Sequence, residues 1–165
     1  NLKHVYSNKK HNMSYINKSK SDVWGTPKHI LKDYPNYFDP CPHPDPRPSW
    51  DGLTIDWLSK KKLFVNPPYS NIKPWAKKCY DTLKEAQKFN KDLEIVMLIP
   101  ARTDTSYFFD YIHDSATLEF IRGRLKFTDL TGVSKKAGAA PFPSVLCIYK
   151  NKKRNLTIKI NIHAV

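Results

Sequence analysis

Glycine is scarce in this chain, which has five among its 165 residues, at positions 25, 52, 123, 132 and 138. No two of them are separated by a single residue, so a Gly-x-Gly turn is excluded. Long apolar runs are missing too, because no stretch approaches the roughly 18 apolar residues of a membrane-spanning helix. The N-terminal segment is polar where a signal peptide would be apolar. We therefore expect a soluble, intracellular protein without a membrane partner.

Cysteine is also too sparse to organise the fold. Cys41, Cys79 and Cys147 are an odd number of residues at wide spacing, which fits neither a disulfide framework nor a zinc cage. Cys41 and His43 lie close together, but two ligands without further partners at suitable spacing do not make a metal site. We expect reduced thiols and no metal.

Acidic residues are outnumbered, since 28 Lys and Arg stand against 15 Asp and Glu for a formal net charge of +13. An excess of this size favours a polyanionic partner, because phosphate neutralisation releases counterions. The chain is also rich in Lys, Asn, Ile and Tyr together, a bias that an AT-rich genome would produce without selection for binding. Charge alone therefore favours a nucleic acid but does not establish one.

The chain divides into a short arm and one domain. Residues 1–22 contain five Lys and one Asp among polar residues, which is typical of a loosely attached basic arm. Residues 23–165 hold enough apolar material for one core. Five prolines fall between Pro40 and Pro48, so this segment is expected to be a rigid irregular loop.

Periodicity predicts alternating strands and helices. Thr26 and Pro27 resemble a helix start, residues 71–89 repeat apolar positions as an amphipathic helix does, and 105–113 is a further helix. Two apolar runs ending at proline, 62–65 and 93–99, are typical of buried strands. With the helix between them they predict a parallel crossover unit. Further strands are expected at 118–127, 144–149 and 156–162. The fold class is therefore an α/β sheet with its functional loops at the carboxyl ends of the strands.

The tetrapeptide Asn66-Pro67-Pro68-Tyr69 follows the first of these strands. The lone pair of an exocyclic amine on a purine is delocalised into the ring, so a catalyst must return electron density to the nitrogen. The side-chain carbonyl of Asn66 and the backbone carbonyl of Pro67 would do so as fixed acceptors, with Pro68 holding the backbone rigid. Tyr69 would supply a flat face for stacking on the base. The alternative is a plain loop, since Asn-Pro marks turns wherever it occurs.

An ordered set of motifs surrounds this tetrapeptide between about residues 24 and 150. The motifs are Trp24-Gly25-Thr26-Pro27, Phe38-Asp39-Pro40-Cys41, Asp51-Gly52-Leu53 with Asp56-Trp57, Phe64 to Ser70, Ile99 to Thr105, Phe120 to Phe127 and Ala140 to Ser144. The set resembles the phage-type, Dam-like N6-adenine DNA methyltransferases, which are small enzymes of phages and prophages. The resemblance implies a Rossmann-like S-adenosylmethionine-dependent methyltransferase sheet with helices on both faces, reduced and lacking the Gly-x-Gly donor loop.

The resemblance also implies where S-adenosyl-L-methionine, the methyl donor, would bind. Trp24, Thr26 and Pro27 resemble the segment at its methionine end, and Asp39, Pro40 and Cys41 resemble the loop after the first strand that cradles it. Asp51 or Asp56 could accept hydrogen bonds from its ribose or adenine, and we favour Asp56 because Trp57 beside it could flank an aromatic ring. Asp39 could instead be a simple turn former, as could Asp51 with Gly52.

DNA contacts are expected from basic residues near the same edge of the sheet. Arg102 could hold a phosphate. Arg122, Arg124 and Lys126 alternate along the expected strand and would share one face as a phosphate track, unless that face is only solvated. The loop 128–143, with Lys135 and Lys136, is the candidate segment for base reading.

Three other functions stay open. A protein-glutamine methyltransferase would also use this tetrapeptide, because a glutamine amide is likewise planar and delocalised, but the net charge disfavours a protein substrate. An RNA adenine methyltransferase is compatible with the composition. A non-catalytic nucleic-acid-binding module could retain the fold. We expect a monomer, located in the host cytoplasm if the chain comes from a phage and in the nucleus or cytoplasm if it comes from a eukaryotic virus.

Overall fold

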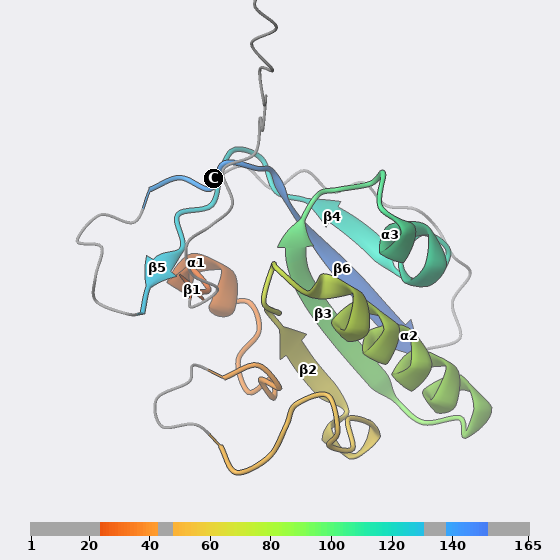
Figure 1. The fold of residues 1–165 in the computed structure, drawn as a ribbon. Helices are drawn as coiled ribbons and strands as arrows, with labels where there is room; N and C mark the ends of the chain where they lie inside the picture. The colour runs from red at the N-terminus through yellow and green to blue at the C-terminus, as the bar shows by residue number, and fades with distance from the viewer. Residues whose placement is uncertain (1–23, 43–47, 131–137, 152–165) are drawn as a thin grey trace, which may run out of the picture.

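A four-stranded mixed sheet forms the centre of the part of the chain that the computed structural model describes, which is residues 24–42, 48–130 and 138–151. Its strands are β2 (Lys62–Val65), β3 (Leu93–Pro100), β6 (Ser144–Asn151) and β4 (Thr117–Phe120), side by side in that order (Figure 1). β2 and β3 run parallel, whereas β6 runs antiparallel to both β3 and β4. The expected α/β class is confirmed, in the form of a mixed sheet.

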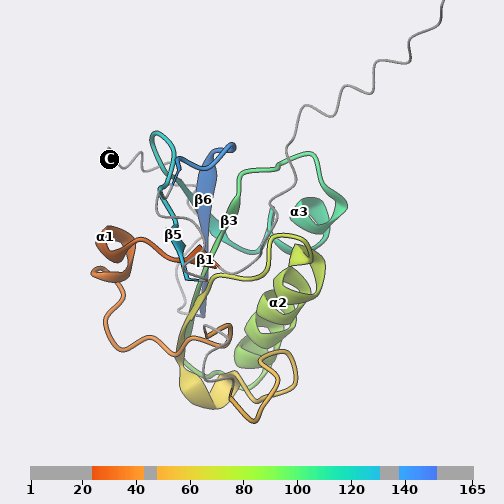
Figure 2. The same ribbon diagram turned by 60° about the vertical axis from the view of Figure 1, so that its left-hand side comes forward.

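Helix α2 (Ile72–Lys88) connects the parallel strands β2 and β3, as the expected crossover unit requires. Its apolar positions are spaced so that one stripe, including Trp75, Cys79 and Leu83, is buried against the sheet. Helix α3 (Ser106–Tyr111) packs beside α2 on the same face (Figure 2). This face holds the larger of the two apolar clusters of the core.

The opposite face of the sheet is covered by a short helix and by loops. Helix α1 (Lys28–Leu31) begins where the sequence predicts a helix, but Pro27 rather than Thr26 is the N-cap residue and no side chain caps the helix. The helix lies on the other side of the sheet from α2 and α3 (Figure 2). Ile30 packs against a second apolar cluster, which includes Phe64, Val96 and Leu98 from the strands. Helices therefore lie on both faces, although the one on this face is only four residues long.

The strand expected at 118–127 is wrong in its length. β4 ends at Phe120, and Arg122 and Gly123 form a bend. Gly123 has a φ of 85°, a left-handed conformation that breaks an extended strand and that glycine adopts without strain. Arg122, Arg124 and Lys126 therefore do not share a strand face, and their alternation in sequence is not a strand pattern.

After this bend the chain forms a small second sheet. Lys126 makes an isolated antiparallel bridge with Ala139. Strand β5 (Thr128–Asp129) then pairs antiparallel with β1 (Trp24–Gly25). The two-stranded sheet ties the segment before α1 to the segment that follows β4. The arm 1–22, the expected strand 156–162, and Lys135 and Lys136 lie outside the described residues.

Phe38 extends the main sheet beyond β2. Its amide donates to the carbonyl of Lys62 at 3.0 Å, and its carbonyl accepts from the amide of Phe64 at 3.0 Å, which makes a parallel bridge to Leu63. Asp39 therefore leaves the sheet at the same edge as Asn66, which follows β2. Ligands of open α/β sheets bind at this carboxyl edge.

Candidate active site

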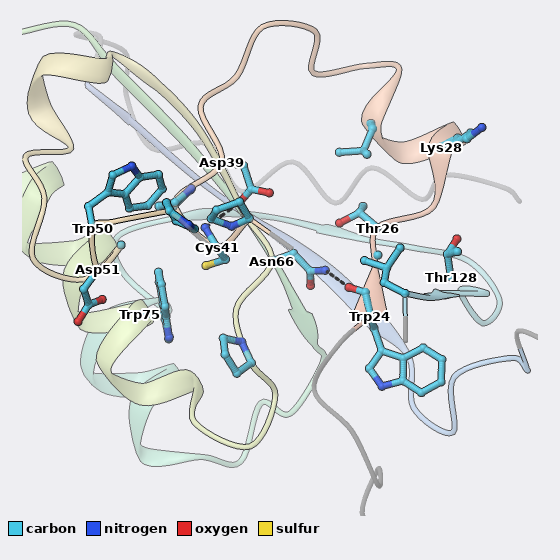
Figure 3. Close-up of a pocket in the computed structure, with 18 residues that line it drawn as sticks. Trp24, Thr26, Lys28, Asp39, Cys41, Trp50, Asp51, Asn66, Trp75 and Thr128 are labelled. Atoms are coloured by element: carbon cyan, nitrogen blue, oxygen red, sulfur yellow. Dashed lines mark hydrogen bonds between the residues drawn. The ribbon is translucent and has the colours of Figure 1, made fainter. Parts of the chain in front are cut away.

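The side chain of Asn66 is oriented by a backbone carbonyl from β1. Its Nδ2 donates to the carbonyl oxygen of Trp24 at 3.2 Å (Figure 3). Because the amide is planar, this hydrogen bond also sets the direction of Oδ1, its acceptor atom. The carbonyl of Pro68 accepts from the amide of Asn71 at 3.0 Å, which closes a turn before α2. The tetrapeptide thus connects the buried strand β2 to the turn at residues 68–71 that precedes α2.

Asn66 and Pro68 form part of the wall of a cavity of about 670 Å³, a volume within the range of small-molecule sites. One end of this cavity carries Trp50, Asp51 and Trp75, and the other lies between β1, β5 and α1 (Figure 3). The full lining is Trp24, Gly25, Thr26, Lys28, Leu31, Asp39, Pro40, Cys41, Pro42, Pro48, Trp50, Asp51, Gly52, Asn66, Pro68, Trp75, Thr128 and Leu130.

Two carboxylates of the cavity wall each stabilise a turn of their own loop. Asp39 Oδ1 accepts from the amide of Cys41 at 2.7 Å, and Asp51 Oδ1 accepts from the amide of Leu53 at 2.9 Å. Each carboxylate has a second oxygen that these bonds do not use. Partial desolvation raises the pKa of Asp39 above its usual value, and the hydrogen bond from Cys41 opposes that rise.

The thiol of Cys41 stays protonated at neutral pH. Burial raises its pKa, and the neighbouring carboxylate of Asp39 raises it further. A thiol in this state is a poor nucleophile. Cys41 therefore contributes shape to the cavity wall rather than covalent chemistry.

The loops at the aromatic end of the cavity fit closely together. Gly52 is buried, and a Cβ at this position would collide with the carbonyl oxygen of Pro40. The carbonyl of Gly52 accepts from the indole nitrogen of Trp57 at 2.7 Å. Phe38 and Trp50 pack with ring centroids 5.5 Å apart. The turn that carries Asp51 is therefore held against the loop after Phe38.

Five of the expected donor-binding residues line this cavity, namely Trp24, Thr26, Asp39, Pro40 and Cys41. Pro27 is buried beside it at the start of α1. Trp57 is in the core and 1% exposed, and Asp56 accepts from the amides of Leu58 and Ser59 at 2.8 and 3.4 Å. Neither Asp56 nor Trp57 lines the cavity, whereas Asp51 does.

Sequence reasoning missed Trp50 and Trp75 in the cavity wall. Trp50 stands directly before Asp51-Gly52, so its proximity to a turn with a carboxylate was a usable signal. Trp75 occupies an apolar position of α2 that is indistinguishable from a core residue in the sequence.

Tyr69 is not part of the cavity wall. Its ring packs edge-to-face against those of Phe127 and Phe142, with centroids 5.8 and 5.6 Å away. The hydroxyl is buried and has no hydrogen-bond partner among the described residues, and burial raises its pKa. Asn66 thus faces the cavity, whereas Tyr69, three residues later, lies in an aromatic cluster.

The expected phosphate contacts lie in loops. Arg102 lies two residues after the end of β3, and its carbonyl accepts from the hydroxyl of Thr105 at 3.0 Å. Arg122, Arg124 and Lys126 follow β4, and all four basic side chains are exposed. None of the four lines the cavity. They would therefore be available to a large anionic partner rather than to a small molecule inside the cavity.

The described residues contain no group of three or more His, Cys, Asp or Glu side chains that could hold a metal ion. Within the same ranges, the longest helices are too short or too polar to cross a bilayer.

Fold and site together define an α/β protein with a ligand-sized cavity at the carboxyl edge of its sheet and an Asn-Pro-Pro-Tyr turn beside that cavity. Residues 48–164, well over half of the chain, match the family model of the DNA N-6-adenine-methyltransferases (Dam), and the chain belongs to this family. The family's activity is methylation of adenine in DNA at N6. Searches of curated proteins and of solved structures found no match.

Proposed function

We propose that this protein transfers a methyl group from S-adenosylmethionine to the 6-amino nitrogen of an adenine that is flipped out of DNA. The proposal depends mainly on one observation, the amide of Asn66 held by the carbonyl of Trp24 at the edge of the cavity. Membership of the DNA N-6-adenine-methyltransferase family supports the reaction type and the substrate.

Asn66 and Pro67 act as hydrogen-bond acceptors for the target amine. Asn66 Oδ1 and the carbonyl oxygen of Pro67 accept its two hydrogens, which localises the lone pair on nitrogen. S-adenosylmethionine supplies a methyl group on a sulfonium, a good leaving group. The nitrogen forms the new bond to the methyl carbon, and the electrons of the broken carbon–sulfur bond stay on sulfur. The methylated nitrogen then loses one of its protons to solvent, so no general base is needed beforehand.

The cavity residues fit the donor in both size and chemistry. Trp50 and Trp75 offer apolar surface for its adenine, and the unused oxygen of Asp51 suits its ribose hydroxyls. Asp39, which lines the same cavity as Asn66, suits the positively charged ammonium group. We therefore assign the ribose contact to Asp51 in place of Asp56, whose side chain stabilises a turn outside the cavity wall.

DNA is bound by the exposed basic residues of the loops, Arg102, Arg122, Arg124 and Lys126. Tyr69 stacks on the extruded adenine, which offsets part of the few kcal/mol that extrusion costs. The loop 128–143 contributes base reading, and residues 23–165 act as one methyltransferase domain.

Asn66→Ala tests the mechanism. It should abolish transfer of labelled methyl from S-adenosylmethionine to unmethylated plasmid DNA, because the amine loses a fixed acceptor, while DNA binding stays nearly intact. Asn151→Ala is a matched control, since the Asn151 amide also donates to backbone carbonyls, at 2.9 Å to Ala86 and 2.6 Å to Lys91, but at the opposite end of β3. Wild-type turnover in Asn66→Ala would disprove the mechanism.

Calorimetry with S-adenosylhomocysteine, the reaction product, tests the donor site separately. Saturable heat is expected for the wild type and for Asn66→Ala. A non-catalytic module that merely retains the fold would show none.

A further inference from the structure

We propose that Phe127 and Phe142 are positioning residues that hold the ring of Tyr69 in place for the extruded base. This inference rests on the proposed function, because it concerns the placement of Tyr69 in that reaction. Neither phenylalanine lines the cavity or belongs to the tetrapeptide. Both act on the reaction only through Tyr69.

The geometry of the three rings is that of an aromatic cluster. The Tyr69 ring makes an interplanar angle of 87° with Phe127 and of 68° with Phe142, at centroid distances of 5.8 and 5.6 Å. Edge-to-face pairs at these distances are favourable and directional. Neither contact is a parallel stack, so neither phenylalanine takes the arrangement that a stacked adenine would adopt.

The aromatic contacts position the Tyr69 side chain without help from its hydroxyl. That hydroxyl is buried and has no hydrogen-bond partner among the described residues. A tyrosine fixed by its polar end would show such a partner. The orientation of the ring therefore depends on what packs around it, and among the described residues Phe127 and Phe142 make the ring contacts with it.

Phe127 and Phe142 lie on two paired backbone segments, residues 125–127 and 139–142, which we call the stem. The amide of Ala140 donates to the carbonyl of Leu125 at 2.8 Å, and Lys126 bridges to Ala139. Leu125 and Ala140 are buried, as is Phe127, which is 5% exposed. The stem thus fixes the backbone from which both rings project.

The same stem also reaches Asn66. Directly after Phe127, β5 pairs with β1, with Thr128 opposite Gly25. β1 in turn contributes the Trp24 carbonyl that orients the Asn66 amide. One backbone element therefore positions both ends of the tetrapeptide, Tyr69 through its phenylalanines and Asn66 through β1.

The position of Tyr69 outside the cavity wall separates base placement from donor binding. Asn66 and Pro68 face the cavity, whereas Tyr69 lies among the phenylalanines. Loss of a phenylalanine ring should therefore disturb the alignment of the adenine and leave the donor site unchanged. Misplacement of a reacting group by about 1 Å can cost on the order of a hundredfold in rate.

The test compares Phe142→Leu and Phe142→Tyr, because Phe142 is only half-buried and both variants should fold. Steady-state kinetics on unmethylated plasmid DNA give kcat and the KM for S-adenosylmethionine, and calorimetry gives the Kd of S-adenosylhomocysteine. We expect kcat of Phe142→Leu to fall by roughly tenfold or more, with KM and Kd within twofold of wild type. Phe142→Tyr keeps the ring and should restore kcat.

One control completes the design. Phe109→Leu removes an aromatic ring from α3 that is 60% exposed, and it should leave kcat unchanged.

Three results would overturn the inference while the wild type remains active. These are an unchanged kcat in Phe142→Leu, an equal loss in Phe142→Tyr, and a parallel loss of donor binding that marks a general structural defect. If the wild type itself transfers no methyl group, the proposed function fails, and the inference fails with it.

Discussion

Asp51 and Asp56 are chemically alike and five positions apart, yet they occupy different places in the molecule. Each is exposed and accepts a backbone amide two residues ahead, at 2.9 Å for Asp51 and 2.8 Å for Asp56. Only Asp51 lines the cavity. The sequence favours Asp56 because Trp57 stands beside it, but Trp57 is buried in the core, and only the packing of Gly52 and Trp57 shows which carboxylate reaches the cavity.

Because Asp51 and Asp56 are so alike, the same substitution at each position gives a matched comparison of donor binding. Asp51→Asn retains the Oδ1 acceptor of the turn but removes the charge that would receive the ribose hydroxyls. A hydrogen bond to a charged group contributes about 1.5–3 kcal/mol, so we expect S-adenosylhomocysteine to bind roughly tenfold more weakly. Asp56→Asn should bind it as the wild type does. Calorimetry on both variants makes the comparison, and equal losses would remove the assignment to Asp51.

The proposed catalytic turn is more accessible to sequence reasoning than its surroundings. Asn66 was expected after a buried strand, and β2 and the turn after it have that arrangement. The partners of Tyr69 could not be foreseen, since Phe127 and Phe142 lie far from it in sequence and only the tertiary packing brings the rings together. The same holds for the carbonyl of Trp24, which precedes Asn66 by 42 residues.

At the scale of elements, periodicity identified the buried segments well and the exposed ones poorly. α2 and β3 bury most of their apolar residues, so their patterns were strong. The strand expected at 118–127 was too long because Arg122, Arg124 and Lys126 alternate with other residues by chance. Gly123 marks the break through its φ of 85°, and a glycine inside a strand pattern is a known sign of such a break.

The close fit between the Asp51-Gly52 turn and the loop after Phe38 gives a testable prediction. Gly52→Ala would force the turn of Asp51 away from the Pro40 carbonyl, because the new Cβ has no room. Overpacking of a buried position typically costs about 1–3 kcal/mol, so the free energy of unfolding in urea should fall by that amount. Binding of S-adenosylhomocysteine should weaken as well, because the displaced turn belongs to the cavity wall.

Gly138→Ala is the control for this substitution. A Cβ at Gly138 meets no atom of the described residues within 4 Å, so the variant should be as stable as the wild type. Unchanged stability in Gly52→Ala would show that the two loops move apart easily. The cavity wall would then be less rigid than their close approach implies.

At the scale of the whole molecule, the net charge of +13 and the family membership point to the same partner. Positive charge alone can reflect composition bias, and it says nothing about where DNA would lie. The structure places Arg102 after β3 and the residues Arg122, Arg124 and Lys126 after β4. β3 ends beside β2, which leads into Asn66. DNA that approaches this edge of the sheet would meet these positive charges close to Asn66, the proposed catalytic residue.

Salt dependence tests this arrangement, because each phosphate contact contributes about 0.9 to the slope of log K against log salt. Arg122→Ala should weaken DNA binding by a similar factor for all sequences and lower the slope by about one.

Lys91→Ala removes an exposed charge just before β3, at the opposite edge of the sheet, and should leave the slope unchanged. Fluorescence anisotropy over a salt series measures both. A loss confined to one DNA sequence would instead assign Arg122 to base reading, and an equal effect of Lys91→Ala would mean that the charge acts without a defined binding face.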